Sequence, residues 1–203
     1  MFMKDVDRTS LIGFLEAMDR AAEDRQTICV MGAAALILLG QPERQTGDID
    51  VWRPGSQVLD SDLRRLAAAS GLSYDPKEYE PEGAYLQIIN PGIVNLPAVR
   101  DDTWATGEDS RILWQGRKLT VICPPPPIIA ASKLVRASEV DIDDVVYLIG
   151  AIGVARKQIL QAADKFPDAD RETIRENMSL VEATLPVAER RAQKRKSRED
   201  PER

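Results

Sequence analysis

Two aspartates lie two positions apart in "DIDVW", residues 48–52. The segment alternates polar and apolar residues, which predicts a half-buried β-strand. Successive side chains of a strand point to opposite faces, so Asp48 and Asp50 share one face, while Ile49 and Val51 point into the core. Two carboxylates about 6–7 Å apart repel each other unless a cation lies between them. Magnesium accepts such oxygen ligands and keeps positions for water and phosphate. We therefore expect Asp48 and Asp50 to bind Mg²⁺ or Mn²⁺.

A glycine turn precedes this strand along the chain. The run "TICVM" (27–31) predicts a buried strand, and "AAALILLG" predicts a short helix that ends at Gly40. A strand that runs through Gly32 directly into a helix presents backbone N–H groups at the helix N-terminus, which favours phosphate binding. The order of strand, glycine turn, helix and D-x-D strand thus predicts a phosphate site beside the metal-binding pair.

Histidine is absent from the 203 residues. This absence excludes Ser-His-Asp triads, Cys-His nucleophiles, histidine-bound zinc and histidine general bases. Chemistry in this chain must therefore use carboxylates, Lys, Arg, hydroxyls and a metal that prefers oxygen. The two cysteines, Cys29 and Cys123, each lie in an apolar strand-like segment. We interpret them as buried free thiols, with a disulfide, unusual in a cytoplasmic protein, as the less favoured alternative.

The elements that must position these residues fall into two regions. The first region mixes helices with strands, and the second is wholly helical. We expect helices over 9–25 (with Thr9 or Ser10 as N-cap) and 60–72, strands over 84–89 and 92–99, a polar turn-rich segment over 73–84, a hairpin over 111–123, and then helices over 128–138, 141–152, 154–165 and 170–195. This order predicts an α+β fold, in which a mixed sheet with flanking helices is followed by a helical C-terminal part.

The predicted boundary is the proline run at 124–127, a stiff connector that cannot donate to a sheet. We expect a sheet domain over 1–123, a helical domain over 128–195 and a disordered tail over 196–203. The longest apolar run, 28–39, is too short to span a bilayer. The N-terminus lacks the features of a signal peptide, so a cytoplasmic protein without membrane contact is expected.

A net charge of −6 argues against a protein whose whole surface binds nucleic acid. The last fifteen residues are nevertheless rich in Arg and Lys. We interpret this tail as a solvated helix end, with RNA contact as the less favoured alternative.

The segment "GAAALILLGQPERQTGDIDVW" (32–52) resembles the signature of the minimal nucleotidyltransferase fold, a glycine turn at a helix start followed by a strand with D-h-D. It is most similar to the AbiEii-type toxin nucleotidyltransferases and their uncharacterised relatives. A second segment, "PPPPIIAASKLVRASEVDIDDVVYLI" (124–149), resembles their later block, which carries a lysine on one helix and an aspartate pair that opens the next.

The resemblance implies a role for each matching residue. Asp48 and Asp50 would bind metal, and Lys133 would steady the triphosphate. The residues implied in substrate binding are Gly32, Ala33, Arg44, Thr46, Asp141 and Asp144. For Asp141 and Asp144 the alternative is that they cap a helix, because aspartates in a first turn favour the helix dipole, and the two roles are compatible. The implied reaction transfers a nucleoside monophosphate from an NTP to an acceptor hydroxyl, with two Mg²⁺ ions on the attacking and leaving oxygens.

Three hypotheses remain from the sequence. The first is a metal-dependent nucleotidyltransferase that modifies tRNA, another RNA or a protein hydroxyl. It would be the toxin of a toxin–antitoxin or phage-defence pair, with a cognate antitoxin protein as partner. The second is a degenerate fold of the same kind that binds nucleotide or a partner without turnover. It is favoured by Ala33 and Ala34 in place of a Gly and a hydroxyl residue, and by Asn95 in place of a third carboxylate, unless Asp101 or Asp102 supplies it. The third is a small regulatory protein without a site.

Overall fold

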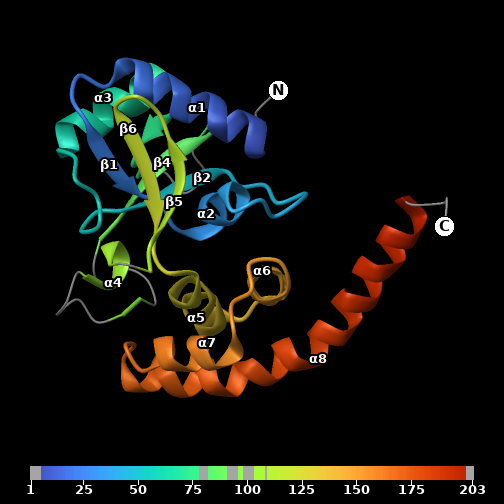
Figure 1. The fold of residues 1–203 in the computed structure, drawn as a ribbon. Coiled ribbons are helices and arrows are strands. Elements are labelled where there is room, and N and C mark those ends of the chain that lie inside the picture. Colours follow the sequence, from blue (N-terminus) through green and yellow to red (C-terminus); the bar gives the residue numbers. More distant parts are fainter. Residues whose placement is uncertain (1–5, 78–81, 91–95, 98–102, 108, 200–203) are drawn as a thin grey trace. The chain divides into compact units, whose positions relative to one another are not determined.

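The structure is a computed structural model that describes residues 6–77, 82–90, 96–97, 103–107 and 109–199. The chain divides into two compact units, Met1–Val94 with Val99–Pro125 and Asn95–Ala98 with Pro126–Arg203. Strands and helices mix in the first unit, and the second is helical, which confirms the expected α+β class (Figure 1).

The first unit contains two three-stranded sheets. One has the order β1-β6-β5 and the other the order β2-β4-β3. The strands are β1 (Gln26–Cys29), β2 (Asp48–Trp52), β3 (Ser73–Tyr74), β4 (Tyr85–Ile89), β5 (Arg111–Gln115) and β6 (Leu119–Cys123). β5 and β6 are antiparallel, whereas the β1–β6, β2–β4 and β3–β4 pairs are parallel. An antiparallel bridge between Val30, the residue after β1, and Val51 on β2 links the two sheets. The D-x-D strand therefore lies beside the end of β1.

The helices of this unit are α1 (Arg8–Ala21), α2 (Gly32–Leu38), α3 (Asp60–Ser70) and α4 (Thr103–Thr106). α1 and α3 pack against each other (Figure 1). α2 ends where Gly40 adopts a positive φ, and α3 ends at Gly71, which is also left-handed, as the glycine positions predicted. The N-cap of α1 is Asp7, which accepts from Ser10 N (2.8 Å), and not Thr9 or Ser10. A carboxylate one turn earlier is an equally good acceptor for the first free N–H groups.

Two short elements were not expected. β3 lies inside the segment interpreted as turn-rich, and α4 lies in a stretch without helical periodicity. Elements this short contain too few residues to show a periodic pattern, so their conformation depends on contacts with the surrounding structure. The strand expected over 92–99 lies largely outside the described residues.

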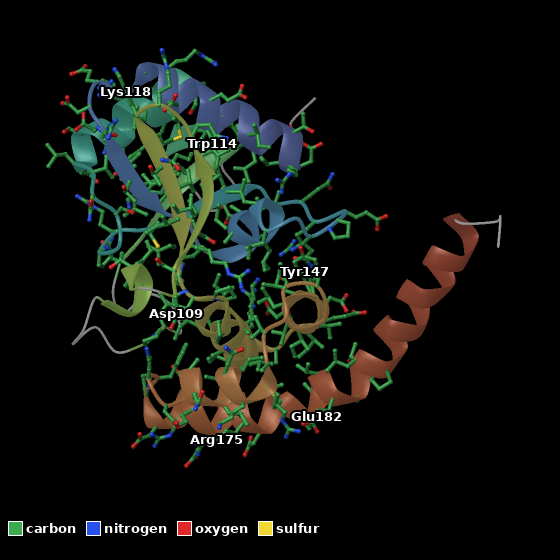
Figure 2. The ribbon with its side chains drawn as sticks, viewed as in Figure 1. Asp109, Trp114, Lys118, Tyr147, Arg175 and Glu182 are labelled. Carbon is green, nitrogen blue, oxygen red and sulfur yellow. The ribbon has the colours of Figure 1, made fainter. Side chains whose placement is uncertain are left out.

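Asp19 fixes α1 to the β5–β6 turn. Asp19 is 8% exposed, and its carboxylate accepts from Arg117 N (3.1 Å), Lys118 N (2.8 Å) and Leu119 N (2.8 Å). Lys118, labelled in Figure 2, also donates its Nζ to Ala22 O at the end of α1 (2.7 Å). Burial alone would raise the pKa of Asp19, but these three N–H donors lower it. The Asp19 carboxylate and the Lys118 ammonium group therefore both tie the β5–β6 turn to α1.

The second unit consists of α5 (Pro126–Arg136), α6 (Glu139–Gly150), α7 (Arg156–Ala163) and α8 (Asp168–Glu199), which pack on one another (Figure 1). α5 begins inside the proline run that we interpreted as a connector. Proline is tolerated in a first helical turn because the N–H it lacks would be unpaired there. α8 continues to Glu199, beyond the expected end at 195.

Ion pairs between exposed side chains join the α7 region to α8. Arg175 Nη2 lies 2.8 Å from Asp164 Oδ1, and Glu182 pairs with Arg156; Arg175 and Glu182 are labelled in Figure 2. Such exposed pairs contribute little stability, so the buried apolar residues of α5, α6, α7 and α8 hold the unit together. They include Leu134, Val145, Ile159, Ile174 and Val181, all with no exposed surface.

Both cysteines are free and buried, as predicted. Within the described ranges, no helix combines the length and the apolar character needed to cross a membrane.

Candidate functional site

The D-x-D strand presents its carboxylates as the alternation predicted. Ile49 is 1% exposed and Val51 is fully buried, while Asp48 and Asp50 are half-buried on the opposite face. β2 is flanked by β4 and bridged to Val30, so its backbone is rigid where the two carboxylates project. The pair is thus positioned by a strand and not by a mobile loop.

Asp50 lies directly against Gly32. A Cβ built on Gly32 would come within 2.1 Å of Asp50 Oδ2 and within 3.2 Å of its Cγ. Gly32 also has φ +59°, in the left-handed region that L side chains rarely adopt. The backbone supports the same arrangement, because Met31 N donates to Asp50 O (2.8 Å). The glycine turn therefore brings the start of α2 into contact with a carboxylate of the D-x-D strand.

The first residues of α2 supply the candidate phosphate contacts. The N–H groups of the first turn have no intrahelical acceptor, and Met31 at the N-cap offers no side-chain bond. Ala33 is 8% exposed and Ala34 is 1% exposed, so both methyl groups pack into the core. Only the backbone of these positions, and no hydroxyl, is offered to a ligand.

Asp48 is held by Thr46. The Thr46 hydroxyl donates to Asp48 Oδ1 (2.6 Å). Thr46 is itself fixed by an antiparallel bridge to Val6, with Val6 N to Thr46 O at 2.7 Å and Thr46 N to Val6 O at 3.2 Å. The adjacent Arg44 is half-buried and donates Nη1 to Gln45 O (2.7 Å). Thr46 thus contacts the carboxylate pair directly.

The structure adds two residues of β4 to the site, and the sequence analysis did not identify either of them. The parallel register places Tyr85 opposite Asp48 and Gln87 opposite Asp50, and both are half-buried on the same face. Burial first, and then the charges of Asp48 and Asp50 with a hydrogen bond to Asp48, raise the pKa of Tyr85. The alternation of 84–89 predicted the strand, but its register with β2 depends on contacts between distant segments.

Three predicted residues of the second unit form one cluster within that unit. Lys133 Nζ on α5 lies 3.2 Å from Asp141 Oδ1 and 2.8 Å from Asp144 Oδ2 on α6. Both carboxylates are fully buried, and the Lys133 side chain is 10% exposed. The three residues that the resemblance grouped are therefore in direct contact, as an ion-paired cluster between two helices.

Asp141 also caps α6. Ser138 and Asp141 form a capping box, and Arg136 adds two bonds to the same carboxylate, from Nε (2.6 Å) and Nη2 (2.7 Å). Burial alone would raise the pKa of Asp141, but the hydrogen bonds from Arg136 and Ser138 and the charge of Lys133 lower it well below its usual range. Helix capping and ion pairing thus coincide at this residue.

The carboxylates available for a metal are limited. Over the described ranges, no group of three or more His, Cys, Asp and Glu side chains is arranged to hold a metal ion. Asp48 and Asp50 form a pair, with the amide of Gln87 on the same face. Asn95, Asp101 and Asp102, the expected sources of a third ligand, lie outside the described residues.

Comparison with known proteins assigns the chain to a family. Residues 9–179 match the family model described as nucleotidyltransferase of unknown function (DUF6036), and the chain belongs to this family. The match spans both the D-x-D strand and the Lys133 cluster. No curated protein and no solved structure matches the chain.

Proposed function

We propose that this member of the nucleotidyltransferase family transfers a nucleoside monophosphate from an NTP to an acceptor hydroxyl in a metal-dependent reaction. The observation that carries the proposal is the contact between Gly32 and Asp50, with Asp48 on the same face. This contact puts backbone N–H groups, suited to phosphate, next to carboxylates suited to a cation.

The residues present fit a hard divalent cation. Over the described residues, β2 and β4 offer oxygen ligands on this face, from the carboxylates of Asp48 and Asp50, the amide of Gln87 and the hydroxyl of Tyr85. Magnesium is commonly held by one or two carboxylates, together with water and substrate phosphates, and manganese accepts similar ligands. Asp48 and Asp50 would hold the ion, which when bound supplies charge to polarise the α-phosphate and stabilise the departing pyrophosphate.

The chain's own residues would bind and orient the triphosphate. The N–H groups at Gly32 and Ala33 would donate to phosphate oxygens, and Arg44 would add a positive charge near them. The resemblance implies that Lys133 steadies the triphosphate; within the second unit its ammonium group is ion-paired to Asp141 and Asp144. In the reaction the acceptor oxygen bonds to the α-phosphorus, pyrophosphate leaves, and the hydroxyl proton passes to solvent.

The acceptor that we propose is an RNA hydroxyl, tRNA included, or a protein hydroxyl. The resemblance of residues 32–52 and 124–149 to AbiEii-type toxins supports a role as the toxin of a toxin–antitoxin or phage-defence pair, with an antitoxin protein as partner. This resemblance has two blocks in the same order, and the family match spans both.

A second function is favoured by specific side chains. Ala33 and Ala34 offer no hydroxyl to phosphate, and Gln87 places a neutral amide where a third carboxylate would strengthen metal binding. These residues suit a degenerate member of the family that binds nucleotide, or acts through a partner, without turnover.

One assay separates the two functions. The full chain is incubated with each α-³²P-labelled NTP, Mg²⁺ or Mn²⁺, and total RNA or cell extract. We expect label in a macromolecule with the wild type, reduced at least about a hundredfold by Asp48→Asn or Asp50→Asn. Asp24→Asn, an exposed aspartate of the same unit, is the matched control and should retain transfer. Binding of metal–NTP without transfer would support the second function, and the absence of both would contradict the two proposals.

A further inference from the structure

The Asp48 carboxylate is held by two neutral hydroxyls. Thr46 donates from the preceding loop to Oδ1 (2.6 Å). Tyr85 lies opposite Asp48 in the β2–β4 register on the same face, and burial, the charges of Asp48 and Asp50 and a hydrogen bond to Asp48 raise the pKa of its hydroxyl. The two hydroxyls therefore reach one carboxylate from separate segments of the chain.

Each hydroxyl is carried by a fixed piece of backbone. The bridge to Val6 fixes Thr46, and the parallel ladder fixes Tyr85. Repulsion from Asp50 on the same face would otherwise turn the Asp48 side chain toward solvent before a cation arrives. Hydrogen bonds from rigid donors oppose that rotation.

The hydrogen-bond donors of Asp48 differ in charge from those of Asp141. Asp141 in the second unit is bound by Lys133 and Arg136, whose positive charges compensate its own. The donors that hold Asp48, in contrast, are uncharged. A hydroxyl fixes a carboxylate without neutralising it, so Asp48 keeps the charge that attracts a cation.

We propose that Thr46 and Tyr85 are positioning residues that hold the Asp48 carboxylate in the orientation in which it binds a divalent cation. The inference rests on the proposed metal site. It assigns Thr46 a role through Asp48, and it gives Tyr85 a role that the resemblance did not include. Asp50, the other carboxylate of the pair, lies on β2 beside Gly32.

The test is Mn²⁺ binding to the full chain, measured by calorimetry without nucleotide. Thr46→Val and Tyr85→Phe remove one hydroxyl each with little change of shape. We expect each to weaken Mn²⁺ binding about tenfold, and the double variant more. Thr46→Ser restores the hydroxyl and should restore most of the affinity. Far-ultraviolet circular dichroism checks that each variant is folded.

Tyr74→Phe is the matched control. Tyr74 lies on β3 of the same sheet and donates its hydroxyl to Asp60, away from the D-x-D pair. Its loss should leave Mn²⁺ affinity unchanged. Wild-type affinity in folded Thr46→Val and Tyr85→Phe, with binding lost in Asp48→Asn, would overturn the positioning role and leave the metal site intact. Failure of the wild type itself to bind Mn²⁺ would overturn the metal-dependent function and this inference together.

Discussion

Gly32 and Asp50 share a space that admits no side chain at position 32, because a Cβ there would lie 2.1 Å from Asp50 Oδ2. The glycine therefore does more than permit a turn. It lets the backbone at the start of α2 lie directly beside a carboxylate of the D-x-D strand.

Gly32→Ala should damage this arrangement. The substitution introduces a clash with Asp50 and strains a backbone with φ +59°. We expect a loss of about 1–3 kcal/mol in the free energy of unfolding, and Mn²⁺ binding weakened at least about tenfold because Asp50 must move. Urea denaturation and calorimetry measure the two effects.

Gly13→Ala is the control for this substitution. Gly13 lies in α1, and a Cβ there meets no atom within 4 Å. Alanine should stabilise that helix by about 0.5–1 kcal/mol and leave metal binding unchanged. Unaltered Mn²⁺ affinity in Gly32→Ala would contradict the view that the turn positions Asp50.

Gln87→Glu should strengthen metal binding. Gln87 lies opposite Asp50 on the same face, so a carboxylate there adds a third negative charge to the pair. We expect Mn²⁺ affinity to rise about three- to tenfold, as the number of charged oxygen ligands increases. Gln115→Glu on the exposed face of β5 controls for net charge. An equal gain in both variants would show that Gln87 is not near the ion.

The sequence predicted those parts of the site that depend on local pattern. Alternation in 48–52 placed Asp48 and Asp50 on one face, and the glycine between a strand and a helix marked the turn at Gly32. Tyr85 and Gln87 were missed because the register between β2 and β4 is decided by packing between segments far apart in the chain.

In the second unit, too, the sequence did not predict contacts that depend on the packing of separate elements. The resemblance grouped Lys133, Asp141 and Asp144, but it did not indicate that the lysine would be ion-paired to both buried aspartates. The alternative that Asp141 caps a helix is confirmed, because Ser138 and Asp141 form the capping box of α6. The position of Lys133 required the packing of α5 on α6.

The two thiols should be inert in the folded chain. Burial, the main cause in both, raises the pKa of Cys123 to about 12 and that of Cys29 further, so almost no thiolate exists at pH 8. Iodoacetamide should leave the native mass unchanged and add two groups in concentrated urea, as intact-mass measurement would show. Rapid modification of the native chain would mean that β1 and β6 open readily.

Acid should weaken the α5–α6 contact through Asp141. The pKa of this carboxyl is lowered in the folded chain, while in the unfolded chain it is about 3.9. The unfolded state therefore binds more protons in acid. The stabilisation is complete above about pH 5 and is lost as pH falls toward the lowered pKa. Unfolding in urea, followed by circular dichroism between pH 7 and pH 3, should show this decline.

Asp141→Asn should remove the decline and much of the stability at once. It leaves Lys133 facing Asp144 with one charge fewer to pair, and it removes the bidentate acceptor of Arg136. Breaking a buried pair of this kind costs roughly 3–5 kcal/mol at pH 7. Asp143→Asn, an exposed neighbour on the same helix, should keep both the stability and the acid dependence of the wild type. If Asp141→Asn unfolds with the wild-type pH profile, the acid sensitivity belongs to another carboxylate, for which Asp19 at the β5–β6 turn is the next candidate.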